Sequence, residues 1–291
     1  MDLVVRVEHI PVPGETVLGS SLQRTCGGKG ANQAYTCGKL GGDVEILGSV
    51  GTDDNGNALI ESLRTVGVET AFLQRVQAET GLALIEVEAS GDNSIVVAQG
   101  ANLCTDAAYI EANRARIEAA DAVIMQLEIP MESVMRAAEI AKSAGKLVIL
   151  DPAPAMPLPE KLCRNIDIIK PNENELALLT GIPVRSPEDA AIAARALLAG
   201  GVGTVVVTLG EEGAVVVSED GARHYPGKPA DAIDTTAAGD SFTAAMALLI
   251  ARGYSLTDAV DFAISVSSLV VTKAGAQSSI PSGEEVAHML P

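Results

Sequence analysis

Short apolar runs alternate with longer amphipathic stretches along most of the chain. Five of these runs are almost continuously apolar and rich in Val, Ile and Leu: Val44 to Val50, Ala122 to Leu127, Leu147 to Leu150, Ile166 to Lys170 and Thr204 to Leu209. Such runs are typical of strands that are buried on both faces, in a parallel sheet covered by helices. The pattern therefore predicts a sheet at the centre of the molecule.

Helical stretches lie between the apolar runs. They span Asp106 to Ala119, Met131 to Ala144 and Pro187 to Leu198. Asp106 and Ser186 are typical N-cap residues, and a proline is favoured at the start of a helix. The alternation of strands and helices predicts an α/β layered domain with right-handed crossovers.

Two regions break this rhythm. Leu3 to Glu8 and Thr16 to Arg24 flank a Pro/Gly turn, and Leu82 to Glu88 and Ser94 to Ala98 flank Ser90-Gly91-Asp92-Asn93. Alternating strands around such turns indicate hairpins, so we expect antiparallel strands outside the main sheet that form one small β-lid. The predicted division is residues 1–24 and 79–99 for the β-lid, and residues 25–78 and 100–291 for the α/β core.

Composition narrows the range of functions. The 291 residues are 47% hydrophobic and carry 20 basic against 38 acidic side chains, a net charge of −18. Disorder is therefore a poor description, and a field of this sign disfavours nucleic-acid and membrane-surface partners. The four cysteines form no C-x-x-C pair, no apolar run could span a bilayer, and the N-terminus lacks the shape of a signal peptide. We expect a cytoplasmic protein with reduced thiols.

The most informative segment is Asp234-Thr235-Thr236-Ala237-Ala238-Gly239-Asp240, which leads into the helical pattern of Ser241 to Arg252. Small residues at a helix start leave backbone N–H groups free to hold an anion. A carboxylate beside that anion could take the proton of an attacking hydroxyl, an arrangement suited to phosphoryl transfer. A plain helix N-cap explains the spacing equally well.

Other polar segments stand at turns and strand ends. Gly27-Gly28-Lys29-Gly30-Ala31-Asn32 enters a helix and offers donors to hydroxyls or to an anion, or is simply a tight turn with a solvated Lys. Asn172 and Glu175 follow a predicted strand and could order the water shell of a metal ion, or form a capping box. Thr208 to Gly213 is either a hairpin or a nucleotide-contact loop, and Glu128 follows another strand. No Walker A or dinucleotide fingerprint is present.

Taken together, these segments resemble the ribokinase / carbohydrate kinase family over almost the whole chain. The GGKGANQA stretch and the Asp234 to Asp240 signature carry most of the specificity, and Asp151-Pro152-Ala153-Pro154-Ala155 adds to it. The resemblance implies a ribokinase-like three-layer α/β/α sandwich with a mostly parallel central sheet and a β-lid. It implies ATP-dependent phosphorylation of D-ribose at the 5-hydroxyl, magnesium bound with ATP, potassium as an activator, and a homodimer formed through the lid.

The resemblance also implies roles for single residues. Asp240 matches the catalytic base, and the N–H groups of Ala237, Ala238 and Gly239 match the anion hole. Sugar-binding positions map onto Asp2, Gly28, Lys29, Asn32, Glu128 and Asp240. ATP-binding positions map onto Asn172, Glu175, Thr208, Leu209, Gly210, Glu211, Gly213 and Gly239. Potassium ligands, several of them backbone carbonyls, map onto Asp234, Thr236, Val270, Lys273, Gly275 and Ser279.

The chain departs from the family pattern at three places. Ala237 stands where many members have Gly, and Ile264 stands where a polar side chain is common near the adenine. Members also begin with a core strand ahead of the position of Asp2, so we expect that this sequence starts at an internal methionine and lacks that strand. Two alternatives remain: a kinase of another sugar or nucleoside, and a catalytically impaired ligand-binding relative.

Overall fold

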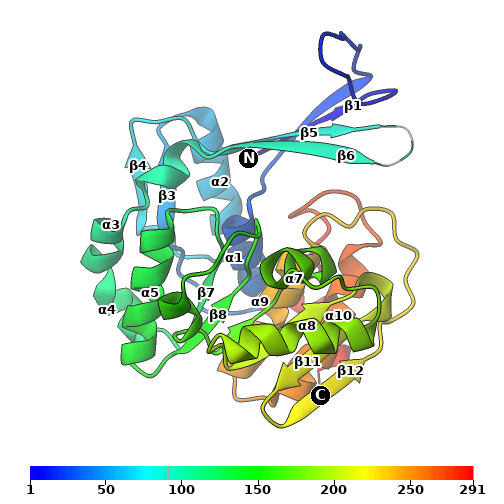
Figure 1. The fold of residues 1–291 in the computed structure, drawn as a ribbon. Helices are drawn as coiled ribbons and strands as arrows, with labels where there is room; N and C mark the ends of the chain where they lie inside the picture. Colours follow the sequence, from blue (N-terminus) through cyan, green and yellow to red (C-terminus); the bar gives the residue numbers. More distant parts are fainter. Residues whose placement is uncertain (89, 91, 291) are drawn as a thin grey trace.

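A six-stranded sheet lies at the centre of the computed structural model, which describes residues 1–88, 90 and 92–290 (Figure 1). Its strands follow the order β12-β11-β10-β9-β8-β7. The four strands β7 to β10 are parallel, and β11 and β12 extend the sheet in antiparallel fashion. Their bounds are β7 Ala122–Met125, β8 Leu147–Leu150, β9 Ile168–Ile169, β10 Thr204–Thr208, β11 Ala214–Ser218 and β12 Gly221–Tyr225.

Strand side chains alternate between two hydrophobic cores, one on each face of this sheet. Val148 and Leu150 of β8 belong to one core, and Ile149 belongs to the other. The first core packs against helices α5 (Met131–Ser143) and α8 (Pro187–Ala199), and the second against α9 (Ala238–Ala251) and α10 (Leu256–Val270). Burial on both faces explains why the strands read as continuous apolar runs. The predicted three-layer sandwich is confirmed.

The remaining helices connect these layers or flank the second, smaller sheets. They are α1 Lys29–Lys39, α2 Asp54–Thr65, α3 Ala107–Ala112, α4 Arg114–Ala119, α6 Glu160–Cys163, α7 Glu173–Thr180 and α11 Gly283–Val286. None of the helices in the described ranges is long and apolar enough to cross a membrane.

The prediction of one continuous helix over Asp106 to Ala119 is wrong. The chain forms α3 and α4 instead, separated at Asn113. The Asn113 side-chain amide donates to the Tyr109 carbonyl oxygen at 2.9 Å. Such a local bond offers the backbone an alternative to continued helix. The predicted N-cap is confirmed, because Asp106 accepts a hydrogen bond from the Tyr109 N–H at 2.8 Å.

The apolar run at Val44 to Val50 is not a strand of the main sheet, contrary to prediction. Only β3 (Gly48–Gly51) is extended, and it pairs in parallel with β4 (Leu73–Val76) in a separate two-stranded sheet. Val44 and Ile46 pack instead on a small core beneath α2. Val44 and Ile46 are only partly buried, and Glu45 between them is exposed and forms an isolated bridge with Glu69, so this segment pairs with the chain before β4 and not with the main sheet.

A four-stranded sheet, β2-β1-β5-β6, projects away from the core in Figure 1. The prediction of purely antiparallel strands is wrong, because β1 (Asp2–Arg6) pairs in parallel with β5 (Leu82–Val87). The other two pairings are antiparallel, with β2 (Ser21–Thr25) and β6 (Asn93–Ala98) at the edges. Gly91 of the predicted Ser90 to Asn93 turn lies outside the described residues.

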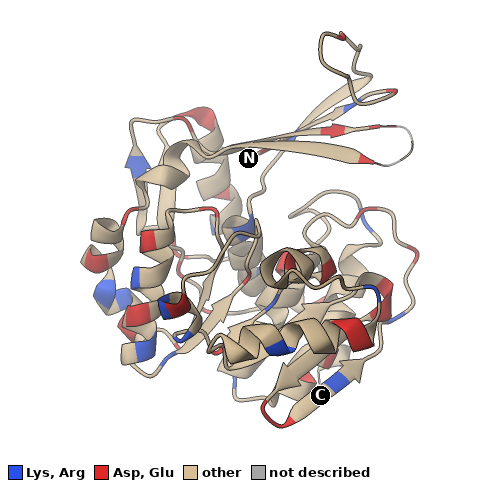
Figure 2. Cartoon of the chain, in the orientation of Figure 1, with Lys and Arg blue, Asp and Glu red and all other residues tan. Residues whose placement is uncertain are grey.

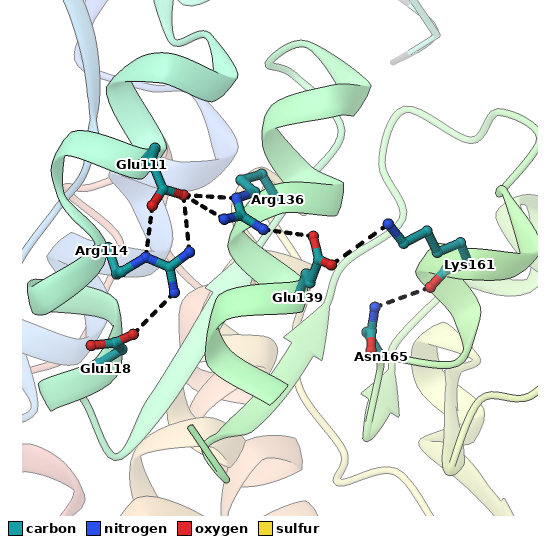
Figure 3. A network of polar contacts seen from close by, with 7 residues as sticks. All are labelled: Glu111, Arg114, Glu118, Arg136, Glu139, Lys161 and Asn165. Carbon is teal, nitrogen blue, oxygen red and sulfur yellow. Dashed lines mark hydrogen bonds and ion pairs between the residues drawn. The ribbon is translucent and has the colours of Figure 1, made fainter. Parts of the chain in front are cut away.

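A network of ion pairs joins the helices on one side of the sandwich (Figure 3). Glu111 on α3 pairs with Arg114 of α4 at 2.7 Å and with Arg136 of α5 at 2.6 Å. Arg136 also pairs with Glu139, which lies 3.6 Å from Lys161 of α6. The network therefore connects four helices through exposed charges.

We expect Glu111→Gln to lower the Tm at pH 7, with a difference from the parent protein that shrinks as the pH falls. Hydrogen bonds from Arg114 and Arg136 lower the pKa of Glu111 from 4.5 to about 2. A carboxyl with a depressed pKa contributes stability above its ordinary pKa of 4.5, and this stability is lost as the pH falls through about 2. Thermal unfolding at several pH values checks this. Glu219→Gln, on an exposed side chain, is the control, and a difference that does not change with pH would contradict the prediction.

Candidate active site

A cavity of about 1200 Å³ opens between the four-stranded sheet, helix α1 and the start of helix α9, and it extends past β3 and β7 to Ala251 at the C-terminal end of α9. Its lining includes all six predicted sugar-binding residues together with Glu175, Thr236 and Ala237. The predicted set in the lining is Asp2, Gly28, Lys29, Asn32, Glu128 and Asp240. Residues that are more than 200 positions apart in the sequence thus share one cavity.

The entry into α1 is built around two glycines. Gly28 has a φ of +95°, a conformation that favours glycine. Gly27 is buried against the carboxylate of Asp2, and a Cβ atom at Gly27 would lie 1.9 Å from Asp2 Oδ2. The backbone N–H of Lys29 then donates to Glu128 Oε2 at 3.1 Å. The glycine turn therefore brings the strand that carries Asp2 close to the first turn of α1.

Asp240 is buried, as are Asn32 and Asp2 among the predicted sugar-binding residues. Its side chain is 7% exposed and accepts hydrogen bonds from Asn32 Nδ2 at 2.8 Å and from Gln33 Nε2 at 3.2 Å. Burial raises the pKa of Asp240, and the charge of Asp151 adds to this, while the Lys29 ammonium opposes it. A carboxylate with a raised pKa is a stronger base than a solvated one once it is ionised.

Three further charged groups face Asp240 across the cavity. Burial raises the pKa of both Asp2 and Glu128, and the negative charge of Asp240 contributes to both shifts. Burial alone would lower the pKa of Lys29, but the carboxylates of Asp240, Asp151 and Glu128 outweigh it and the pKa is raised. Lys29 thus remains a cation among carboxylates, and the cavity offers both donors and acceptors to a polyol.

The start of α9 departs from ordinary backbone geometry. Ala237, the N-cap, has a φ of +61°, the one positive value at a non-glycine residue among those described. The Ala238 N–H donates to the Thr235 carbonyl oxygen at 3.2 Å, so this predicted member of the anion hole is already engaged within the loop. Ala237 and Gly239 have no such loop contact in the described part of the chain. A positive φ at a residue other than glycine costs free energy, and such residues are typical of functional turns.

All the predicted ATP-binding residues except Gly239 lie just after β9 or at the end of β10. Asn172 and Glu175 form a reciprocal capping box on α7, with N–H to oxygen distances of 2.9 and 2.8 Å. Asn172 forms an isolated parallel β-bridge with Thr208. The turn that follows β10 is closed by a hydrogen bond from the Leu209 N–H to the Gly213 carbonyl oxygen at 2.8 Å. Of this group, Glu175 lines the cavity.

Among the predicted potassium ligands, Asp234 contacts both Thr236 and Gly275. Asp234 Oδ2 accepts the Gly275 N–H at 2.8 Å, and Asp234 Oδ1 accepts the Thr236 hydroxyl at 2.6 Å. Lys273 directs its ammonium to Glu285, so this residue could contribute only its backbone carbonyl. One carboxylate surrounded by neutral oxygens fits a large monovalent cation better than a transition metal.

Sequence reasoning missed three buried residues beneath Asp240: Gln33, Asp151 and Lys170. Lys170 Nζ lies 3.1 Å from Asp151 Oδ2, and the two side chains are 4% and 2% exposed. A signal was present, because each of these charged residues directly follows the apolar residues of a buried strand. Buried charges need partners, so two such positions on neighbouring strands point to a pair.

Comparison with known proteins gives a consistent result. A model of the pfkB family of carbohydrate kinases matches residues 1–283. The chain is 39% identical over 290 residues to a ribokinase of Haemophilus influenzae, covering 99% of this chain and 95% of that protein. It is 34% identical over 287 residues to a deoxyribokinase of Salmonella typhi, covering 98% and 94%.

Among solved structures, an Arabidopsis thaliana ribokinase in complex with ribose and ATP matches with a TM-score of 0.91 and 33% identity. The match covers 99% of this chain and 95% of that one. The fold is thus ribokinase-like, as the sequence predicted.

Proposed function

This chain belongs to the pfkB family of carbohydrate kinases and is a sugar kinase, and we propose that it transfers the γ-phosphate of ATP to the 5-hydroxyl of D-ribose. The observation that carries the proposal is the buried Asp240 carboxylate at the junction of the cavity and the first turn of α9. Ribose as the substrate is supported by the ribokinases to which the chain is similar.

The sugar occupies the cavity with its hydroxyls among Asp2, Lys29, Asn32 and Glu128. The Oδ1 atom of Asn32 is buried and has no hydrogen-bond partner in the described part of the chain. A buried acceptor without a donor costs free energy, and a sugar hydroxyl would supply that donor. The neighbouring Nδ2 of Asn32 already holds Asp240, so one side chain can orient both the sugar and the base.

Asp240 accepts the proton of the 5-hydroxyl as the bond from O5 to the γ-phosphorus forms and the bond from the γ-phosphorus to the β-phosphate oxygen breaks. ADP leaves with the electron pair of that bond. The N–H groups of Ala237 and Gly239 stabilise charge on the transferring group. When ATP is bound as its magnesium complex, Asn172 and Glu175 would order the water around that ion, which would neutralise charge on the phosphates.

Potassium, when bound beside Asp234, supplies a positive charge that rigidifies the loop preceding α9. Asp234, Thr236 and Gly275 hold that loop, and the carbonyls of Val270 and Lys273 and the hydroxyl of Ser279 complete the proposed donor set. The fully buried position of Ser279, whose hydroxyl contacts the Ala276 carbonyl, keeps this set close to the protein interior.

We propose further that the four-stranded sheet acts as a lid over the sugar and as the contact between two copies of the chain. Its strands carry few charges (Figure 2), and several large apolar side chains on it are exposed. They are Leu22 at 67%, Leu84 at 46%, Ile95 at 55%, Val96 at 61% and Val97 at 52%. Exposed apolar side chains on an edge-bearing sheet favour pairing with another chain.

A phosphorylation screen tests the substrate. With ATP, we expect kcat/KM for D-ribose to exceed that for 2-deoxyribose, ketohexoses and nucleosides by at least about tenfold, the discrimination typical of one lost hydrogen bond or more. The deoxyribokinase relative makes 2-deoxyribose the strongest competitor. A preference for any of these over ribose would overturn the assignment, and ribose binding without turnover would favour the ligand-binding alternative.

A further inference from the structure

A buried network lies directly beneath the proposed base. Gln33 Nε2 donates both to Asp240 Oδ1, at 3.2 Å, and to Asp151 Oδ2, at 2.9 Å. The carboxylates of Asp151 and Asp240 thus share one amide nitrogen, and both side chains are less than 10% exposed. Two carboxylates this close in a buried site cannot both ionise easily unless a cation compensates for one of them.

Lys170 is that cation. Its ammonium lies 3.1 Å from Asp151 Oδ2 and 3.4 Å from the Gly239 carbonyl oxygen. Thr243 Oγ1 also contacts both groups, at 3.3 Å from Asp151 Oδ2 and 3.0 Å from the Gly239 oxygen. The pair therefore touches the first turn of α9 on one side and, through Gln33, the base on the other. Lys170 and Asp151 are 3% and 2% exposed and are absent from the cavity lining, and their contacts with the site run through Gln33, Thr243 and Gly239.

We propose that Lys170 and Asp151 form a positioning pair, which fixes the Asp240 carboxylate through Gln33, fixes the α9 turn through Gly239, and keeps Asp240 ionised during turnover. This inference rests on the proposed role of Asp240 as base. A buried ion pair contributes little to stability compared with an apolar pair of the same volume, so a functional role accounts for its presence better than stability does.

Other charged groups also face Asp240, and the test must separate them from the pair. They are Asp2 from β1, Lys29 from α1, Glu128 after β7, Asp151 after β8 and Lys170 after β9, with Glu175 of α7 facing Lys29 and Asp151. Only Asp151 and Lys170 form a direct ion pair with each other in this group. Removing one member therefore changes the local charge by one unit without disturbing the sugar-binding side chains.

The pair predicts opposite effects for its two single variants. In Lys170→Met, the uncompensated Asp151 raises the pKa of Asp240, so the acid limb of the kcat profile moves to higher pH by about one unit or more. In Asp151→Asn, which preserves the side-chain shape, the uncompensated Lys170 moves that limb to lower pH. The double variant, which removes both charges, returns the limb close to the position in the parent protein.

The experiment compares pH profiles of kcat for the parent, the two single variants and the double variant at saturating ATP and sugar. Lys142→Met, which removes the lysine of an exposed ion pair with Asp167, is the matched control and leaves the limb unchanged. Thermal unfolding shows that each protein is folded. If Lys170→Met does not fold, Asp151→Asn and the double variant still give the predicted pair of results.

The positioning role would be overturned if the acid limb of the kcat profile did not move in the single variants. It would also be overturned if both single variants moved the limb in the same direction. Failure of the parent to phosphorylate ribose would instead contradict the proposed substrate, and the same variants would then be compared on the sugar that the screen identifies. The two outcomes are therefore separable, because one depends on the sugar chosen and the other on differences between variants.

Discussion

Asp240→Asn lowers the kcat of sugar phosphorylation by about 10²- to 10⁴-fold, the range expected for loss of a general base, while the KM values change little. The asparagine has the same shape and its one amide oxygen can accept one of the two hydrogen bonds, from Asn32 or from Gln33, but it cannot accept the hydroxyl proton. Steady-state kinetics with ribose and ATP, together with thermal unfolding, measure the effect.

Asp220→Asn is the matched control for this prediction. Asp220 is exposed in the turn between β11 and β12 and does not line the cavity, so its replacement should leave kcat unchanged. Near-normal turnover by Asp240→Asn would remove Asp240 from the role of base. A variant that loses activity together with its cooperative unfolding transition would show a structural role instead.

Gly27→Ala raises the KM for the sugar by at least about tenfold, equivalent to about 1.4 kcal/mol of lost binding. A Cβ atom at this position would lie 1.9 Å from Asp2 Oδ2 and 2.4 Å from Asp2 Cγ, so the Asp2 side chain must leave its place in the cavity. The KM for ATP should change much less, because Asn172 and the turn after β10 are not displaced. Initial-rate measurements with each substrate varied in turn separate the two constants.

Gly283→Ala controls for the general effect of adding a methyl group to a glycine. The nearest atoms to a Cβ at Gly283 lie at 3.6 Å, an ordinary van der Waals distance, so neither KM should change. Unchanged sugar binding in Gly27→Ala would mean that Asp2 is not needed for the sugar. An equal rise in both KM values would point to a general disturbance of α1.

The parts of the fold that periodicity predicted best are those buried on both faces. The strands β8 and β10 were predicted as apolar runs because the four residues of β8 and the three valines of β10 each enter one of the two cores. The Asp234 to Asp240 segment was also visible as the start of a helix, but its spacing alone fitted a plain N-cap equally well, and the family resemblance decided between the two. The grouping of Asp2, Lys29 and Glu128 with Asp240 depended on the family resemblance, because no local pattern relates such distant positions.

The features that could not be predicted depend on tertiary contacts. The break at Asn113 depends on one side-chain bond to Tyr109, and the detachment of β3 from the main sheet depends on which segments stand beside it. The Lys170–Asp151 pair required knowing that β8 and β9 are neighbours. The order of strands in a sheet depends on the whole fold. A run of apolar residues predicts a strand but does not say which other strand lies next to it.

Asp2 belongs to β1 of the four-stranded sheet, whereas Asp240 belongs to α9 of the core. Because Gly27 leaves no room between Asp2 and the chain entering α1, any outward swing of that sheet must pull the Asp2 carboxylate away from Gly27. Release of the product and loss of its contact with Asp2 would then occur in the same motion. The dissociation rate of the sugar phosphate would accordingly be governed by the stiffness of this junction.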